Sequence, residues 1–192
     1  MQTNLAEKWR SAFLQVVQQP THAQALQTAG EQKQLKEWTT ALTAVVVSAC
    51  QTLGWQASAK GYSLELLPVP TNEFLTMDVM AFAGAAERWQ FPIAVIELEN
   101  NWERSAYSLW KVLCVRVALR VVFCYCKTAG ERRELINYLE REILQPILPR
   151  ERLNLQGETL VVVGSRDAAL TFPYDFFKWW LMEVNIGKFT LF

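Results

Sequence analysis

Three carboxylates stand where two neighbouring predicted strands end. The apolar stretch over residues 92–96 leads into Glu97 and Glu99, which share one face because strand side chains alternate. Asp78 lies on the preceding predicted strand. A hairpin turn centred near residues 87–88 would place Asp78 opposite Glu97, within about 5 Å at Cβ. The spacing therefore predicts a patch of three acids.

Three carboxylates this close repel one another, and each resists ionisation unless a cation neutralises them. Hard oxygen ligands of this number suit Mg²⁺ or Mn²⁺. Such an ion could activate a water and stabilise a phosphodiester under attack. We therefore predict Asp78, Glu97 and Glu99 as metal ligands. The alternative is that Glu97 and Glu99 simply face water where the strand ends.

A lysine follows the acids in the next predicted helix. Glu103, Tyr107 and Lys111 recur at i, i+4 and i+8 and share one helical face. Because this helix begins where the strand of Glu97 ends, Lys111 could reach the acidic patch. There its charge would stabilise a nucleophile or a phosphorane-like oxyanion. The alternative is a solvent-facing lysine paired with Tyr107 or Glu103.

The sequence contains few of the residues that other classes of enzyme use for catalysis. His22 is the one histidine, in a polar N-terminal stretch, so His-based hydrolases and His-rich zinc sites are disfavoured. Neither a dinucleotide-binding glycine motif nor a phosphate-binding P-loop is present. With 19 basic and 19 acidic side chains, the net charge is zero, and a global basic field for nucleic acid is absent.

The composition favours a cytoplasmic protein that does not enter a membrane. The N-terminus lacks the basic start and apolar run of a signal peptide. The longest apolar candidate, residues 41–50, is shorter than the ~18–20 residues of a membrane span. The four cysteines lie in apolar segments without a CxxC pair and are expected to be reduced core residues.

Hydrophobic periodicity predicts four main helices and a series of strands in one domain. Helices are expected over 4–18, 31–53, 105–119 and 129–144, with a shorter turn over 21–29; strands are expected over 55–59, 62–69, 74–83, 91–99, 120–126, 158–165 and 174–184. The last segment could also be a helix. A hairpin that feeds a β-α-β unit predicts an α/β fold with a mixed sheet flanked by helices.

The chain resembles the PD-(D/E)xK nuclease-like superfamily over residues 31–126. The run DVMAF…PIAVIELENN…YSLWKVLCV…RVVFCYC carries the resemblance. Asp78 matches the acid of the second core strand, and Glu97-Leu98-Glu99 matches the ExK motif of the third, with glutamate in the lysine position. Lys111 matches a subgroup in which a lysine follows in the helix.

The resemblance implies a restriction-endonuclease-like αβββαβ core. Residues 1–30 would form an N-terminal helical extension, and residues 127–192 a helix and strands that complete the sheet of a single domain, 1–192. It also implies a catalytic role for Glu99 and Lys111, and for Glu37 as the helix-borne acid often seen in this fold. The alternative for Glu37 is a solvated helix acid.

The resemblance implies two functions. Members of the superfamily bind divalent metal, Mg²⁺ or Mn²⁺, and cleave phosphodiester bonds; others have lost catalysis and only bind or scaffold. Glu99 cannot supply the positive charge of the usual lysine, although some restriction enzymes of the superfamily use glutamate there. Lys111 would be a migrated replacement, and Lys60 is a weaker candidate. Nucleic acid is the expected partner of the active form.

Aromatic residues predict packing more than recognition. Trp9, Trp38 and Trp110 fall on apolar helical faces and are expected in the core. The aromatic run that contains Trp179 and Trp180 could form a homodimer interface, since aromatics concentrate at such sites. The basic clusters over 127–133 and 149–152 carry nearby acids and are expected to be solvated faces.

Overall fold

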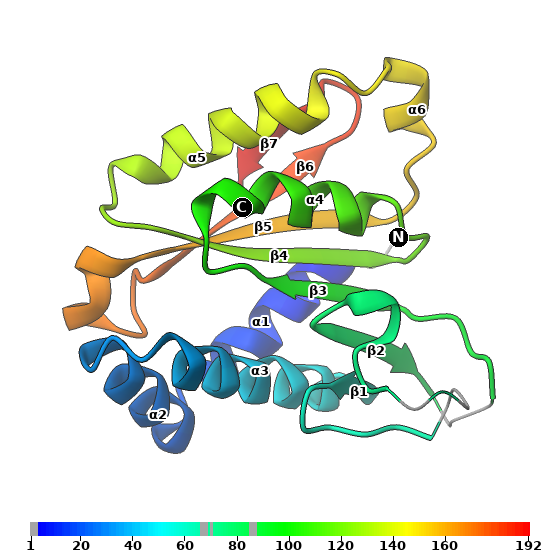
Figure 1. Cartoon of the computed structure of the whole chain (residues 1–192). Helices are drawn as coiled ribbons and strands as arrows, with labels where there is room; N and C mark the ends of the chain where they lie inside the picture. Colours follow the sequence, from blue (N-terminus) through cyan, green and yellow to red (C-terminus); the bar gives the residue numbers. More distant parts are fainter. Residues whose placement is uncertain (1–3, 66–68, 70, 85–87) are drawn as a thin grey trace. The chain divides into compact units, whose positions relative to one another are not determined.

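The structure, a computed structural model, describes residues 4–65, 69, 71–84 and 88–192. The chain divides into two compact units, Met1–Ile96 and Glu97–Phe192, called here the first and the second unit. Each unit combines helices with strands (Figure 1), which confirms the mixed α/β class. The organisation as a single domain stays a prediction.

Three helices open the first unit. They are α1 (Leu5–Val17), α2 (Pro20–Glu31) and α3 (Leu35–Thr52). The Asn4 side chain caps α1 by accepting from the Glu7 N–H at 3.0 Å. α3 packs against both other helices and against β1 (Trp55–Ala59). The second helix is longer than the short turn expected, and Pro20 begins it as its first residue.

The strands of the first unit are antiparallel. β1 pairs with β2 (Val79–Ala83), which pairs with β3 (Ala94–Leu98) up to Ile96; the last two residues of β3, Glu97 and Leu98, belong to the second unit. The pairs of β2 and β3 run from Ala81↔Ala94 to Val79↔Ile96. This register is the one expected from a turn centred near residues 87–88. The paired residues end at Val79↔Ile96, so the expected pairing of Asp78 with Glu97 stays a prediction.

Two strand predictions for the first unit are wrong in extent. Of residues 62–69, the described part holds no strand, only a single bridge between Tyr62 and Ala59. The segment 74–83 begins with a 3-10 turn, η1 (Phe74–Thr76), in which Leu75 and Thr76 have positive φ. That backbone is not extended, so β2 starts only at Val79.

The second unit contains a mixed set of strands. β4 (Leu119–Cys126) and β5 (Glu158–Ser165) run parallel, while β6 (Phe177–Glu183) and β7 (Lys188–Leu191) continue antiparallel from β5. Every residue of β4 is buried. The strand predictions for β4, β5 and β6 are confirmed, and β7 adds a short strand that the hydrophobic pattern did not indicate.

Helices α4 (Ser105–Leu113) and α5 (Glu131–Leu139) lie in front of these strands in Figure 1, and α4 packs on β4. A 3-10 turn, η2 (Trp102–Arg104), leads into α4; a π-helical turn, η3 (Glu140–Leu144), extends α5; and the short α6 (Pro149–Leu153) and the turn η4 (Arg166–Thr171) complete the unit. The predicted helix over 129–144 is thus confirmed, with a change of hydrogen-bond pattern in its last turn.

The helix predicted over 105–119 ends instead at Leu113, and a buried arginine explains why. The Arg120 guanidinium donates to the carbonyls of Val112 (3.1 Å), Val115 (2.8 Å) and Gln156 (2.8 Å). It thereby adds a side-chain donor to the Val112 and Val115 carbonyls at the end of α4, and its charge suits a helix C-terminus. Burial lowers the pKa of this guanidinium.

Several burial predictions can be checked. Trp9 and Trp38 are buried as expected, but Trp110 is 51% exposed, because it lies on the outer face of α4. Cys50, Cys124 and Cys126 are buried, whereas Cys114 is exposed after the end of α4; all four thiols are free. Trp179 and Trp180 are buried, and a dimer through this region would have to use exposed neighbours such as Tyr174 and Leu191.

Within the described residues, no helix is both long and apolar enough to cross a membrane.

Candidate functional site

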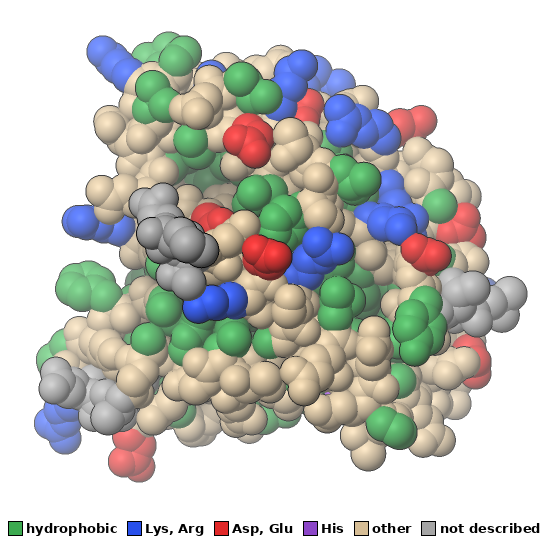
Figure 2. Space-filling view, turned by 180° about the vertical axis from the view of Figure 1, so that it is seen from behind, with side chains coloured by type: hydrophobic (Ala, Val, Ile, Leu, Met, Phe, Trp, Pro, Cys, Tyr) green, Lys and Arg blue, Asp and Glu red, His purple; other side chains and the backbone are tan. Residues whose placement is uncertain are grey.

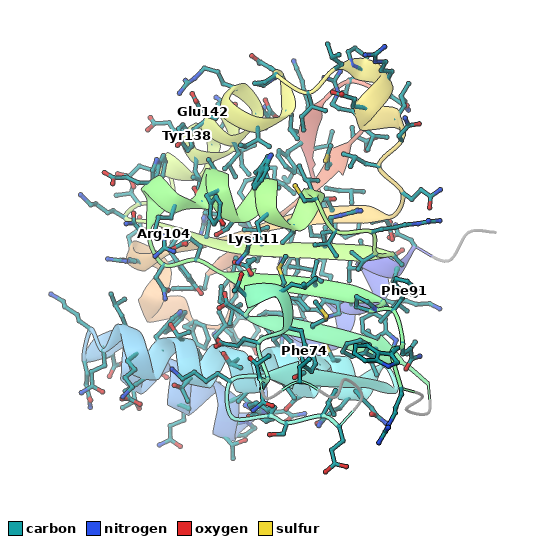
Figure 3. The ribbon with its side chains drawn as sticks, turned by 45° about the vertical axis from the view of Figure 1, so that its right-hand side comes forward. Phe74, Phe91, Arg104, Lys111, Tyr138 and Glu142 are labelled. Atoms are coloured by element: carbon teal, nitrogen blue, oxygen red, sulfur yellow. The ribbon has the colours of Figure 1, made fainter. Side chains whose placement is uncertain are left out.

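Glu97 meets Lys111 inside the second unit. The Lys111 Nζ lies 2.8 Å from Glu97 Oε2, and the two side chains are 17% and 6% exposed. Glu97 is near the end of β3, and Lys111 projects from α4. Figure 3 shows Lys111 on the side of α4 that faces the strands, with Arg104 at the start of the helix. The predicted reach of Lys111 to the strand end is therefore present, and Lys111 does not point into solvent.

The packing of α4 brings the lysine to this place. Ser108, Leu109 and Val112 are buried on the face that contacts β4. Lys111 lies beside this face, next to Val112. A buried ion pair must offset the loss of two hydration shells, and breaking it leaves an uncompensated charge. The pair is thus held by the surrounding fold, and neither partner can be removed without consequence.

Glu99 is held by different partners. Its Oε1 accepts from the Asn101 N–H at 2.8 Å, and its Oε2 accepts from the Ser108 hydroxyl at 3.3 Å. The Arg104 guanidinium lies 3.6 Å from Oε2 and is largely exposed. The Glu99 N–H donates to the Phe123 carbonyl of β4 at 3.0 Å. These contacts fix the carboxylate and supply positive charge from one side.

The turn between Glu99 and α4 is ordered by its own side chains. The side-chain Oδ1 of Asn101 accepts from the Glu103 N–H at 2.9 Å, as an N-cap does. The Ser105 hydroxyl donates to the Trp102 carbonyl at 2.6 Å. The sequence Asn-x-Glu signals such a cap. The roles of Ser108 and Arg104 as partners of Glu99 had no comparable signal and were missed.

The charge of Glu99 acts on the buried thiol of Cys124. Burial raises its pKa far above the ordinary thiol value, and the charge of Glu99 and then Cys126 raise it further. Cys124 is therefore a neutral thiol at neutral pH. It is neither a thiolate nucleophile nor a ready metal ligand, because both roles need the deprotonated form.

The other predicted site residues belong to the first unit. Asp78 is half-buried and directly precedes β2. Glu37 is exposed in the first turn of α3, and Lys60 is exposed in the turn after β1. The catalytic role of Glu37 and the metal-binding role of Asp78 stay predictions.

The acids of the second unit suit a divalent cation in their chemistry. Glu97 and Glu99 supply carboxylate oxygens, the ligands that Mg²⁺ and Mn²⁺ prefer. The Lys111 ammonium, 2.8 Å from Glu97, already balances one of these charges and would compete with a cation. Among residues 4–65, 69, 71–84 and 88–192, no group of three or more His, Cys, Asp or Glu side chains is placed to hold a metal ion. The cation site stays a prediction.

Charged side chains elsewhere are mixed in sign. On the face shown in Figure 2, the described acidic and basic groups lie interspersed. The cluster over 127–133 is only partly a solvated face, because Arg132 is buried and donates to the carbonyls of Asp175 (2.8 Å) and Phe176 (3.0 Å). Arg132 therefore anchors the chain before β6 and is not available to a phosphate.

No protein-family model, curated protein or solved structure matches this chain. The resemblance to the nuclease-like superfamily therefore stays a prediction from the motifs in the sequence.

Proposed function

We propose that this chain is a nuclease-like protein that binds a divalent cation through Glu97 and Glu99 and hydrolyses phosphodiester bonds of nucleic acid. One observation carries the proposal: a lysine from the helix after the ExE strand lies 2.8 Å from the first glutamate, in a buried setting. Lys111 would take the role of the lysine that the ExE motif lacks. Asp78 is proposed as a further ligand from its sequence position alone.

The order of elements supports the proposal. Between residues 35 and 126 the main elements are α3, β1, β2, β3, α4 and β4. This is the α-β-β-β-α-β order of the superfamily. Glu97 lies on the third of these strands, and Lys111 on the helix that follows. Order alone is shared by other α/β proteins, so the weight falls on the ion pair.

Each group of the site would have its own role in phosphodiester hydrolysis. A bound divalent cation supplies positive charge that stabilises the phosphate oxygens. Lys111 would donate hydrogen bonds to the charge that develops on the phosphate. Glu99 would accept the proton of the attacking water as the water oxygen bonds to phosphorus. The bond to the leaving sugar oxygen breaks, and that oxygen takes a proton from solvent.

A second candidate is a non-catalytic protein that keeps the fold for binding or assembly. The same ion pair favours it in one respect. If the Lys111 ammonium permanently neutralises Glu97, it fills the electrostatic role of the cation. The zero net charge also gives no general attraction to nucleic acid.

A cleavage assay separates the two candidates. Single- and double-stranded DNA and RNA are incubated with Mg²⁺, Mn²⁺ or EDTA. The nuclease proposal expects metal-dependent cleavage that is lost in Glu97→Gln, Glu99→Gln and Lys111→Met, and retained in Glu142→Gln. Glu142 is a suitable control because it is an exposed acid paired with Arg141 on η3 (Figure 3).

No cleavage of any substrate would leave the binding protein as the better candidate. Cleavage that survives Glu97→Gln would refute the site assignment instead.

A further inference from the structure

A pocket opens in the second unit beside the Glu99 turn, with a cavity volume of about 410 Å³. Its lining begins with Asn100, directly after Glu99, and includes Trp102 of η2. Tyr125 of β4 and Lys127 just beyond that strand add to it, as does Arg166 directly after β5. Tyr125 is buried, whereas Lys127 and Arg166 are exposed. The pocket therefore combines aromatic groups with cationic ones.

The pocket lies at the carboxyl ends of two parallel strands. Tyr125 pairs with Gly164 and Cys126 with Ser165 at the last positions of β4 and β5. Ligands of open α/β sheets bind at this edge, because the loops that leave parallel strands diverge there. The position alone favours a ligand site over a surface depression.

The walls of the pocket are tied to one another. The Asp167 N–H donates to the Lys127 carbonyl at 3.1 Å, and the Asp167 carboxylate accepts from the Ala129 N–H at 3.0 Å. These bonds connect the loop after β4 with the loop after β5. Trp102 stacks on Tyr138 at a centroid distance of 6.4 Å. A pocket whose walls are fixed before binding loses less entropy when a ligand enters.

The N–H groups of Lys127 and Thr128, in the loop before α5, are not available to an anion. Glu131 Oε2 accepts from the N–H groups of Lys127 (2.8 Å) and Thr128 (3.2 Å), so the acid of the helix itself fills that position. The side chains of Lys127 and Arg166 remain as phosphate contacts. Glu103 and Glu134 also line the pocket and can accept hydrogen bonds from amino groups.

We propose that this pocket holds one unpaired nucleotide of a nucleic-acid strand. Trp102 would stack on the base, Arg166 and Lys127 would contact the phosphate, and Asn100 and the acids would contact the base edge. The acids favour bases that carry an exocyclic amino group. The inference rests on the proposed function, because the pocket would position the strand whose phosphate reaches Glu97, Glu99 and Lys111.

Binding is measured by calorimetry in EDTA, so that no metal-dependent cleavage takes part. The ligands are AMP, CMP, UMP and ribose 5-phosphate, and short single-stranded oligonucleotides of the same bases. AMP and CMP are expected to bind more tightly than UMP, and ribose 5-phosphate most weakly. Oligonucleotides that bind more tightly than the free nucleotides identify a strand as the source; equal affinity would limit the site to free nucleotides and overturn the proposal.

Matched variants locate the site. Trp102→Ala is expected to weaken AMP binding about 5- to 150-fold, the range for loss of one stacked base. Trp102→Phe should retain most of the affinity, which guards against a folding effect. Trp110→Ala is the control, because Trp110 is an exposed tryptophan of α4 that does not line the pocket. Arg166→Gln should weaken binding of AMP. Arg150→Gln is its control, because Arg150 is an exposed arginine of α6 that does not line the pocket.

No binding at millimolar concentration, or equal effects of Trp102→Ala and Trp110→Ala, would overturn the pocket proposal. Glu99→Gln separates this inference from the proposed function. It should abolish cleavage and leave nucleotide binding intact. Cleavage without nucleotide binding would refute the pocket alone, and nucleotide binding without cleavage in any protein form would refute the nuclease alone.

Discussion

Lys111 Nζ lies 2.8 Å from Glu97 Oε2 in the second unit, where Glu97 is buried and Lys111 is only partly exposed. Arg141 and Glu142 form a pair of the same 2.8 Å length on the surface of η3. Equal distance does not imply equal energy. Water screens the exposed pair, whereas the buried pair has lost its hydration and depends on its partner.

Breaking the buried pair should destabilise the protein strongly. Lys111→Met removes the ammonium that lies 2.8 Å from the buried Glu97 charge, and Glu97→Gln removes the carboxylate charge beside the ammonium. Each is expected to lower the free energy of unfolding by about 3–5 kcal/mol. Urea denaturation of the single variants and of the double variant measures this. The loss of unfolding free energy in the double variant should be clearly smaller than the sum of the losses in the two single variants.

The surface pair is the control for that cycle. Arg141→Gln and Glu142→Gln should each change the free energy of unfolding by no more than about 1 kcal/mol. Additive effects at Glu97 and Lys111, or effects no larger than those at the surface pair, would contradict a coupled buried pair.

Gly157 precedes β5 with φ of +84°, where L side chains are strained. A Cβ there would press on the carbonyl oxygens of Val117 and Ala118, at 2.6 Å from the latter. Gly157→Ala should therefore lower the free energy of unfolding by about 2 kcal/mol or more. Thermal unfolding against Gly54→Ala checks this, because Gly54 has φ of +73° in open space. An equal loss of unfolding free energy in Gly157→Ala and Gly54→Ala would contradict the close approach of Gly157 to the two carbonyl oxygens.

Stability in acid should depend on Asp167. The Ser165 hydroxyl, followed by the Ala129 N–H, holds the pKa of its carboxyl below the ordinary 3.8. A lowered folded pKa contributes stability above pH 3.8 that is lost as the pH falls through the folded value. Between pH 5 and pH 2, Asp167→Asn and Ser165→Ala should each lose less free energy of unfolding than the parent protein loses. An unchanged pH dependence in both would contradict this role.

One thiol should react quickly in the native protein. Cys114 is exposed, whereas Cys50, Cys124 and Cys126 are buried, and burial raises the pKa of Cys50 to about 12. Ellman's reagent at pH 8 is expected to modify one thiol rapidly and all four after denaturation. Cys114→Ser should remove the rapid phase. Rapid modification of a second thiol in the folded state would contradict the packing of the strands.

Sequence patterns located the elements where hydrophobic periodicity and turn residues agree. The strand over 158–165 was predicted with its observed bounds, because a β-branched run follows a glycine at positive φ. α2 was underestimated, since only Leu26 and Ala29 of that helix are buried. β7 was missed because Phe189 is its one buried residue. Short helices and strands with only one or two buried residues show little hydrophobic periodicity in the sequence.

The site was predictable in part. The helix after the ExE strand and its lysine were visible from spacing, so Lys111 could be named as a residue able to reach the acids. The partners of the two acids depend on how α4 packs against β4, which the sequence does not reveal. Lys111 pairs with Glu97, and Ser108 and Arg104 contact Glu99. The pocket combines residues from three separate stretches of the sequence, 100–103, 125–134 and 166, and no local pattern signals it.

Direct measurement of Mn²⁺ binding by electron paramagnetic resonance tests the central claim, that Glu97 and Glu99 hold a divalent cation. The expected result is saturable binding to the parent protein that is lost in Glu97→Gln and Glu99→Gln. Lys111→Met should bind Mn²⁺ at least as tightly, because the competing ammonium is gone. The claim would be contradicted by absent binding in the parent protein, by binding indifferent to both glutamine variants, or by binding that appears only in Lys111→Met.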